Sequence, residues 1–283
     1  MKTFSRQPGE ERVRQLACVI CNSSDYVPFL QCNGFSFVKC NRCNMVYQNP
    51  QPVPEDLRKR YDDGYFEYEY ENEENFFQLM LLGLKDIHFD LIESSLPSPR
   101  KFLDIGCATG KLLHHMKARG WEEQGVEICQ PSVLYGIKQR NVKIFFGDLM
   151  EARFPEGLFQ VVHCSHLIEH VTNPKDFFLE VKRILAPAGY FIITTPNIDG
   201  FQAKLFGSAW RSAIADHLFL FSRKTLMHLL NSTGFEVVRW KTWGGLAAGT
   251  APVFLKKAAD RLAKRIGFGD VMIFLLKCKD QLF

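Results

Sequence analysis

Apolar and polar positions follow two patterns along the chain, and the change comes near residue 100. Beyond that point, short apolar runs are followed by longer segments whose apolar residues recur every three or four positions. The short runs predict strands and the longer segments predict helices. Strands are expected at 101–107, 121–128, 143–148, 159–166 and 189–196, and helices at 110–120, 130–140 and 173–189. Strands that alternate with helices predict a parallel sheet with helices on both faces.

The last part of the chain predicts one more helix and two more strands. The helix is expected at 221–235 and the strands at 236–243 and 270–279. Residues 252–266 form a helical pattern with apolar residues on one face and lysines and arginines mostly on the other. Two interpretations of this basic helix stay open. It makes a peripheral membrane contact, or it covers the sheet and exposes a solvated basic face.

The first fifty residues carry a different pattern, in which two pairs of cysteines flank a predicted hairpin. CVIC stands at 18–21 and CNRC at 40–43, with an Asn33-Gly34 turn between them. Two C-x-x-C pairs place four thiolates on two tight turns, which suits tetrahedral Zn²⁺. We expect a structural zinc site with the ligands Cys18, Cys21, Cys40 and Cys43. Cys32 is left out because four thiolates complete the site, and disulfides are the disfavoured alternative.

The segment between the cysteines and residue 100 predicts a linker and a helix. Prolines and turn residues follow the second cysteine pair, and helical spacing runs over 76–96 up to Pro97. The acidic and aromatic stretch at 62–77 has two interpretations. It is a solvated connector, which its composition favours, or a lid whose tyrosines face a ligand.

The strand at 101–107 leads into a loop with an acid and two glycines, FLDIGCATG at 102–110. The loop lacks the spacing of a dinucleotide fingerprint and the Gly-Lys-Ser/Thr end of a P-loop. Asp104 stands just before Gly106, where it would repel a pyrophosphate but suit a ligand with positive charge. S-adenosylmethionine (SAM), with its ammonium and sulfonium groups, is such a ligand.

Two further acids follow the next two predicted strands. Glu127 comes at the end of the second strand, where an acid about 20 residues on can bind ribose hydroxyls. Asp148 comes at the end of the third, placed to accept from an adenine amino group with Leu149 against the ring. Three acids at three successive strand ends predict a SAM site. The alternative is three unrelated acids that cap helices.

These motifs resemble those of class I SAM-dependent methyltransferases, over residues 101–196. FLDIGCATG is similar to the first motif of that superfamily, GVEI to its ribose strand, GDL to its adenine loop and HCSHLIEHV to its fourth strand. CNRCNMVYQNP and YDDGY resemble a group with an N-terminal zinc ribbon, often associated with bacterial polysaccharide or natural-product sugars. The resemblance implies an α/β, Rossmann-like sheet of seven strands and a sugar or nucleotide-linked sugar as acceptor.

The resemblance also implies which residues hold the cofactor. They are Tyr61, Tyr65, Asp104, Gly106, Cys107, Ala108, Gly110, Glu127, Ile128, Asp148, Leu149, Cys164 and Ser165. The two tyrosines belong to the YDDGY stretch and would close over the cofactor. The resemblance therefore favours a lid over a solvated connector for that stretch. Ala108 stands where the superfamily often has glycine, and alanine fits there if its φ is negative.

The expected organisation has three parts. They are a zinc ribbon at 1–50, a linker with lid helices at 51–99, and a SAM-binding domain at 100–283 that includes an insert at 197–220. The insert is too long for an ordinary connection of about 2–6 residues, and long insertions at a ligand edge often form binding walls. Phe201, Trp210 and Arg211 could face an acceptor or could only pack the insert.

Three histidines are candidates for the catalytic residue. If the acceptor is a hydroxyl, a general base would contribute about 10²–10⁴-fold. His217, in the insert, is the preferred base. His166 could touch the cofactor or the substrate, and for His170, in the pair after the fourth strand, the resemblance suggests a structural role.

Net charge and composition limit the classes of partner that we expect. The 283 residues have a net charge of +4 and a pI near 8.5, too mild to predict nucleic-acid binding. An acidic stretch at 62–74 would repel RNA, so we expect a small-molecule acceptor. An RNA methyltransferase and a non-catalytic SAM-binding protein are the alternatives. The first residues lack the apolar region of a secretory signal, which favours the cytoplasm.

Overall fold

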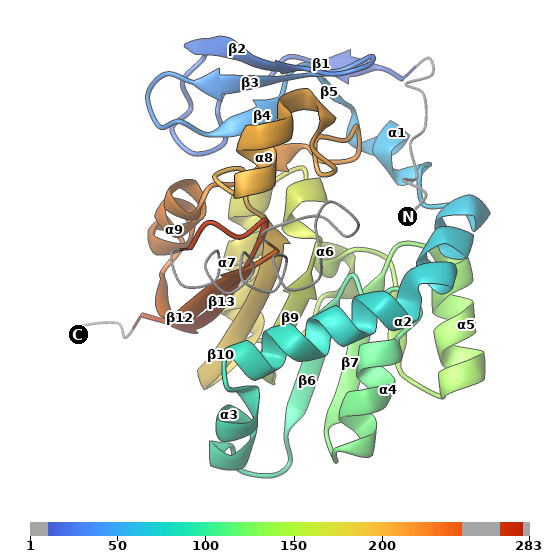
Figure 1. Cartoon of the computed structure of the whole chain (residues 1–283). Coiled ribbons are helices and arrows are strands. Elements are labelled where there is room, and N and C mark those ends of the chain that lie inside the picture. The colour runs from blue at the N-terminus through green and yellow to red at the C-terminus, as the bar shows by residue number, and fades with distance from the viewer. Residues whose placement is uncertain (1–10, 245–266, 280–283) are drawn as a thin grey trace, which may run out of the picture.

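A computed structural model describes residues 11–244 and 267–279, and a seven-stranded sheet lies at its centre (Figure 1). The strand order is β12-β13-β10-β9-β6-β7-β8. The strands are β6 (Lys101–Ile105), β7 (Glu122–Glu127), β8 (Ile144–Phe146), β9 (Phe159–Ser165), β10 (Leu185–Pro196), β12 (Phe235–Trp243) and β13 (Val271–Cys278). Strand β13 pairs antiparallel with both β10 and β12, and the other pairings are parallel. The predicted α/β, Rossmann-like sheet is confirmed.

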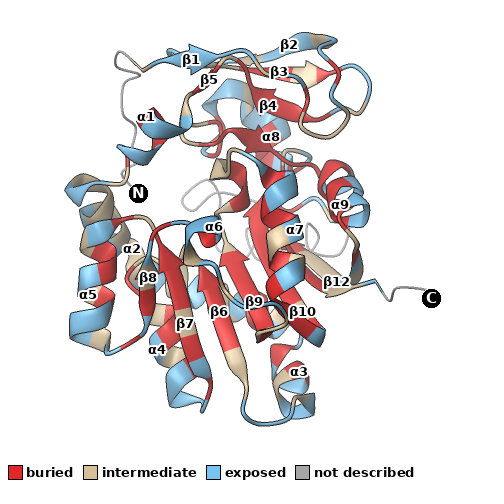
Figure 2. Ribbon diagram, turned by 180° about the vertical axis from the view of Figure 1, so that it is seen from behind, coloured by how far each residue is buried: buried red, intermediate tan, exposed pale blue. Residues whose placement is uncertain are grey.

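Helices cover both faces of this sheet, whose central strands are almost fully buried (Figure 2). One face packs against α2 (Asp63–Asp86), α3 (Phe89–Ser95), α4 (Lys111–Ala118) and α5 (Gln130–Arg140). The other face packs against α6 (Leu149–Ala152), α7 (Pro174–Ile184) and α9 (Arg223–Ser232). Alternate residues of β6 divide between the two cores, with Phe102 in one and Leu103 in the other. This division follows from the period of two along a strand.

The cysteine-rich segment forms a second sheet, and the insert adds a strand to it. The order is β11-β4-β3-β2, with β2 (Tyr26–Gln31), β3 (Ser36–Cys40), β4 (Val46–Gln48) and β11 (Phe219–Leu220). Phe219 pairs with Tyr47, and Leu220 pairs with Val46. A separate two-stranded ladder joins β1 (Val13–Arg14) to β5 (Gln51–Pro52). The ribbon therefore shares its sheet with residues about 170 positions further along the chain.

Three helix boundaries differ from the expected ones. The helix expected at 76–96 begins earlier, at Asp63, with Asp62 as its N-cap, and breaks at His88, whose φ is 58°. The stretch at 62–77 is thus mostly helical. The helix expected at 173–189 ends at Ile184, and β10 starts at the next residue, so no glycine ends this helix.

The remaining short elements lie in the linker, after β9 and in the insert. They are α1 (Pro54–Arg58), η1 (Ile168–His170), α8 (Phe201–Phe206) and η2 (Gly207–Ala209). The expected basic helix at 252–266 falls outside the described residues. Among the helices of the described part, none is long and apolar enough to cross a membrane.

Candidate active site and metal centre

The loop after β6 turns sharply at the carboxyl edge of the sheet. Gly106 and Gly110 have φ of 70° and 72°, and a Cβ at Gly106 would lie 3.1 Å from Leu167 Cδ1. The condition for alanine at this position, a negative φ, is not met, because the φ of Ala108 is 46°. A residue with a Cβ in this region costs about 1–2 kcal/mol. The neighbouring contacts of the loop therefore hold Ala108 in an unfavourable conformation.

Glu127 supplies the main contact that holds this loop. Its side chain is 4% exposed, and Oε2 accepts from the backbone N–H of Ala108 at 2.9 Å. Oε1 accepts from the N–H groups of Ile128 and Cys129, both at 2.8 Å. Burial raises the pKa of Glu127, and these three N–H donors act against that rise. Since an ionised carboxylate has about four acceptor positions, Glu127 retains capacity for a ligand hydroxyl.

The other two expected acids have protein partners as well. Asp104 Oδ1 lies 2.7 Å from Nδ1 of His163, a buried residue of β9 that the sequence did not single out. Asp148 is exposed and caps α6 through a capping box with Glu151, while Leu149 behind it is buried. Asp148 therefore has the capping role that the alternative interpretation assigned to it, at the edge where adenine contact is expected.

The other residues of the loop and the strand ends line the same edge of the sheet. Cys107 and Cys164 are buried, and burial raises the pKa of both thiols, which stay neutral. Ser165 ends β9, next to β6, where Ile105 pairs with Cys164. The residues expected to hold the cofactor thus lie on neighbouring strand ends and in the loop between them.

Two tyrosines at the start of α2 pack against each other near Glu127. The rings of Tyr61 and Tyr65 meet edge to face with centroids 4.9 Å apart. Burial raises the pKa of both hydroxyls, and the charge of Glu127 adds to the rise in each. The charges of Asp216 and Glu169 also raise the pKa of Tyr61.

Helix α2 is attached to the glycine loop by an acid that the sequence did not reveal. Glu73 accepts from the Thr109 hydroxyl at 2.8 Å and from Arg140 Nη2 at 2.6 and 2.8 Å. Arg140 also donates to the carbonyl of Thr109 at 2.6 Å. Spacing alone could not identify this residue, because its partners lie 36 and 67 positions away.

A second polar cluster follows β9 and contains all three candidate catalytic histidines. Glu169 is 1% exposed, with Oε1 3.3 Å from His166 Nδ1, and the rings of His170 and His217 are 4.7 Å apart. Burial and, next, the nearby His170 lower the pKa of His217 to about 3, so His217 is neutral at pH 7. Burial alone would raise the pKa of Glu169, but His166 and the other two imidazoles bring it down to about 2. His166 is half exposed, with a φ of 51°.

Comparison with known proteins decides the family. A family model described as a methyltransferase domain matches residues 81–239, which is more than half of the chain. The chain belongs to this methyltransferase family. The match covers the glycine loop, Glu127 and the cluster after β9. The chain therefore contains a SAM-dependent methyltransferase domain, as the resemblance of its motifs implies.

Two curated relatives illustrate the range of the family. The methyltransferase is 29% identical over 178 residues to a tRNA U34 carboxymethyltransferase of Hydrogenovibrio crunogenus, covering 52% of this chain and 53% of the relative. It is 31% identical over 104 residues to a ubiquinone biosynthesis O-methyltransferase of Rickettsia akari, covering 35% and 41%. The chain thus spans about half the length of these relatives or less.

Solved structures agree on the fold. A chain of the complex between the Haloferax volcanii Trm112 methyltransferase activator and a methyltransferase has a TM-score of 0.59 at 14% identity, covering 80% of this chain and 99% of that one. A SAM-dependent methyltransferase from Thermotoga maritima has a TM-score of 0.54 at 21% identity, covering 76% and 98%. At such low sequence identities, the similarity shows the fold alone.

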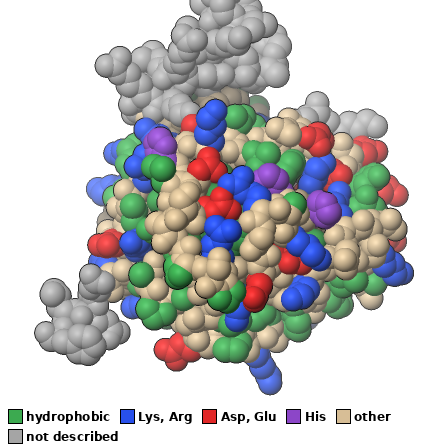
Figure 3. Space-filling model, turned by 90° about the horizontal axis from the view of Figure 1, so that it is seen from below, with side chains coloured by type: hydrophobic (Ala, Val, Ile, Leu, Met, Phe, Trp, Pro, Cys, Tyr) green, Lys and Arg blue, Asp and Glu red, His purple; other side chains and the backbone are tan. Residues whose placement is uncertain are grey.

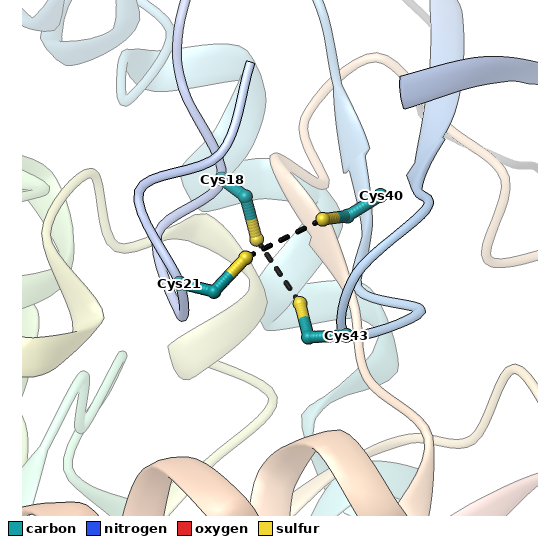
Figure 4. Close-up of side chains that lie close together, drawn as sticks. All are labelled: Cys18, Cys21, Cys40 and Cys43. Carbon is teal, nitrogen blue, oxygen red and sulfur yellow. Dashed lines mark hydrogen bonds between the residues drawn. The ribbon is translucent and has the colours of Figure 1, made fainter. Parts of the chain in front are cut away.

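The methyltransferase also carries a compact group of four cysteines in its ribbon (Figure 4). Cys18 Sγ lies 3.3 Å from Cys43 Sγ, and Cys21 Sγ lies 3.5 Å from Cys40 Sγ. These separations are too long for disulfide bonds of about 2.05 Å. They are close to the roughly 3.8 Å edge of a tetrahedron with Zn–S bonds of about 2.3 Å. The four thiols therefore fit a zinc ion, and Cys32 lies outside the group.

Of the aromatic and basic residues of the insert that could face an acceptor, some are buried by packing and others are exposed. Trp210 is 2% exposed and donates from Nε1 to Asp270 at 2.6 Å, so it packs the insert. Arg211 pairs with the same carboxylate at 2.9 Å but remains half exposed. Phe201 is exposed. The packing alternative holds for Trp210.

From the surroundings of Glu69 we expect SAM binding to depend on pH. This half-buried residue of α2 lines a small cavity with Glu73, Cys107, Ala108 and Thr109. Burial, and then the charge of Glu127, raise its pKa to about 7. A cationic ligand favours the ionised form, so SAM affinity should be full above pH 7 and fall by up to about tenfold per unit as the pH drops through 7.

Calorimetric titration with SAM between pH 5.5 and 8.5 tests this dependence. In Glu69→Gln the step near pH 7 should disappear, leaving only the titration of SAM itself. Glu67→Gln, at an exposed position of the same helix, is the matched control and should keep the step. An unchanged profile in Glu69→Gln would show that this carboxyl does not face the ligand.

Proposed function

We propose that this protein transfers the methyl group of SAM to a hydroxyl of a small, sugar-like acceptor, such as a nucleotide-linked sugar of polysaccharide or natural-product biosynthesis. The observation that carries the proposal is the cluster of Glu169, His170 and His217 next to the cofactor edge of the sheet. A carboxylate with two imidazoles suits binding and activation of hydroxyl groups. The similarity to a ubiquinone biosynthesis O-methyltransferase supports an oxygen acceptor.

In this proposal the residues of the strand ends hold SAM. Glu127 accepts from the ribose hydroxyls, Asp148 and Leu149 contact adenine, and Asp104 with the loop of Gly106, Cys107, Ala108 and Gly110 faces the methionine part. Ile128, Cys164 and Ser165 line the same edge. Tyr61 and Tyr65 close over the cofactor from α2. SAM supplies an activated methyl group, so the residues of the chain act mainly by positioning, which can contribute about 7–11 kcal/mol.

The histidines act on the acceptor in this proposal. His217 donates from Nδ1 to the carbonyl of Ser212 at 2.8 Å, so the lone pair of Nε2 is available to an acceptor group. The ring is neutral at pH 7, so Nε2 can accept a hydrogen bond from the acceptor hydroxyl. His166, half exposed at the edge of the cluster, would contact the acceptor, and His170 would support the ring of His217.

Replacing His217 tests this role. His217→Ala should lower kcat by about 10²–10⁴-fold, the usual contribution of a positioned general base, while SAM affinity stays within about twofold. His228→Ala, on the exposed face of α9, is the control and should retain the normal rate. Turnover at the normal rate in His217→Ala would remove this residue from the mechanism.

The four-cysteine group completes the proposal as a structural zinc site. Cys18, Cys21, Cys40 and Cys43 would bind Zn²⁺ as thiolates, which leaves no open position for a substrate. Its function would be to hold β3, β4 and, through pairing, β11 of the insert. The ribbon would thus act at the acceptor site indirectly.

RNA is the second candidate acceptor, because one relative is named a tRNA U34 carboxymethyltransferase. Against it stands the acidic stretch at 62–74, which would repel RNA. On the face drawn in Figure 3, acidic and basic side chains are interspersed. A membrane contact through 252–266 remains a proposal from the sequence pattern alone.

Transfer of a labelled methyl group distinguishes the acceptors. The zinc-loaded protein is incubated with methyl-labelled SAM and a crude bacterial extract, and label is counted in small molecules, lipids, RNA and protein. Asp104→Ala is the control. Label in small molecules supports the proposal, whereas label in RNA would replace it with the second candidate.

A further inference from the structure

Three side chains from two distant segments converge beside the cofactor edge. Glu169 and His170 come from η1, directly after β9, and His217 comes from the insert. The backbone N–H of Leu218 donates to the carbonyl of Glu169 at 2.7 Å, which fixes the two segments side by side. One ligand atom from each of the three residues lies within 4.8 Å of the others.

Both histidine rings have Nδ1 next to a backbone carbonyl. His170 Nδ1 lies 2.8 Å from the carbonyl of Asp216, and His217 Nδ1 lies 2.8 Å from the carbonyl of Ser212. A carbonyl only accepts, so each Nδ1 carries a hydrogen and the neutral ring has its lone pair on Nε2. Metal-binding histidines usually have this second hydrogen bond, which fixes the ring and its tautomer.

The carboxylate of Glu169 is held by one oxygen and leaves the other without a hydrogen bond. Oε2 accepts from the hydroxyl of Thr195 at 2.8 Å. Oε1 is buried and has no hydrogen-bond partner among the residues that the structure describes, although His166 Nδ1 lies 3.3 Å away. A buried charged oxygen without a hydrogen bond costs about 1–3 kcal/mol, and the contact with His166 offsets only part of that cost. A cation at this point would remove that cost.

We propose that Glu169, His170 and His217 bind a divalent transition-metal ion, and that this ion binds the hydroxyl oxygens of the acceptor. The inference rests on the proposed function and deepens it. Two imidazoles and one carboxylate suit Zn²⁺, Mn²⁺, Fe²⁺ or Co²⁺ better than Ca²⁺, which prefers an all-oxygen set. Three protein ligands leave coordination positions open for substrate, as in catalytic rather than structural sites.

The ion would change the roles of the residues in the methyl transfer. It lowers the pKa of a bound hydroxyl, whose proton leaves to solvent. The oxygen lone pair then forms the bond to the methyl carbon while the carbon–sulfur bond breaks, and its electrons stay on sulfur in the neutral S-adenosylhomocysteine. His217 is then a ligand, and the hydroxyl needs no protein base. An acceptor with two neighbouring oxygens would chelate the ion, as a sugar can.

The experiment measures binding of the metal alone. Protein with one equivalent of zinc in its ribbon is titrated with Mn²⁺, and free Mn²⁺ is followed by electron paramagnetic resonance. The zinc keeps the thiolates occupied. We expect one saturable Mn²⁺ per chain, weakened about 100-fold in Glu169→Gln and in His217→Gln and unchanged in the exposed control His228→Gln. Retained SAM binding shows that the variants are folded.

A spectroscopic measurement on the unaltered protein covers the case in which the variants do not fold. Spin-echo modulation of the bound Mn²⁺ should show two histidine nitrogens. The absence of saturable binding below about 1 mM, or modulation without nitrogen, would overturn the inference. Because neither readout uses methyl transfer, a protein that transfers methyl groups but binds no Mn²⁺ would refute this site and leave the proposed function standing.

Discussion

Replacing Cys40 with serine should lower methyl transfer by about 100-fold although the cysteine lies far from the reacting atoms. Cys40 ends β3, and the turn after it leads into β4, which pairs with β11 of the insert. His217 stands two residues before β11. Loss of one thiolate would weaken the proposed zinc site, since structural zinc typically contributes about 10–16 kcal/mol to folding. A displacement of about 1 Å at a reacting group can cost 100-fold in rate.

The measurements for this prediction are zinc content, kcat and SAM affinity. Cys40→Ser should lose zinc and turnover together, while SAM affinity falls much less, because the hydrogen bonds that hold Glu127 come from the glycine loop and from residues 128 and 129. Cys32→Ser is the matched control, since Cys32 lies in the same segment but outside the four-cysteine group. A zinc-free variant with full turnover would separate the ribbon from the acceptor site.

Glu127→Gln should weaken SAM binding by about 2–4 kcal/mol, which is roughly 30- to 1,000-fold. The carboxylate accepts three backbone N–H bonds with its two oxygens. Glutamine retains one acceptor oxygen and places an NH₂ group against N–H donors. The loop that carries Ala108 at positive φ would lose its main support, and the expected ribose contact would be lost with it.

Calorimetry with SAM and thermal unfolding without it separate the two parts of this effect. Glu122→Gln, on the exposed amino end of β7, is the control for the change of charge. A loss of stability without a loss of affinity would mean that Glu127 only supports the loop. Equal affinities in both variants would contradict the assignment of Glu127 to the ribose.

The sequence predicted those parts of the molecule that depend on local pattern. The period of apolar residues located the strands of the sheet, and the spacing of the cysteines identified the four that lie together. Glu127 was identified because an acid at a strand end has a fixed place relative to the glycine loop. These signals lie within a few residues of one another, or within one repeating unit of the fold.

The sequence did not predict contacts that only folding creates. The positive φ of Ala108 depends on Glu127 and on the packing around the loop. The link from Glu73 to Arg140 joins α2 to α5, and nothing near either residue in the sequence reveals the other. The exposed Asp148 was identified as a ligand contact, and the structure adds that it caps α6. Each of these contacts depends on burial or on pairing between distant residues.

The pairing of β4 with β11 affects the order in which the chain can fold during synthesis. Residues 18–43 leave the ribosome long before residue 219, so the cysteine-rich sheet keeps one edge unpaired until the insert has been synthesised. An unpaired edge strand is a template for association with other chains. A fragment that stops near residue 50 would keep that edge permanently. The segment that looks most separable in the sequence is thus the one least suited to be produced alone.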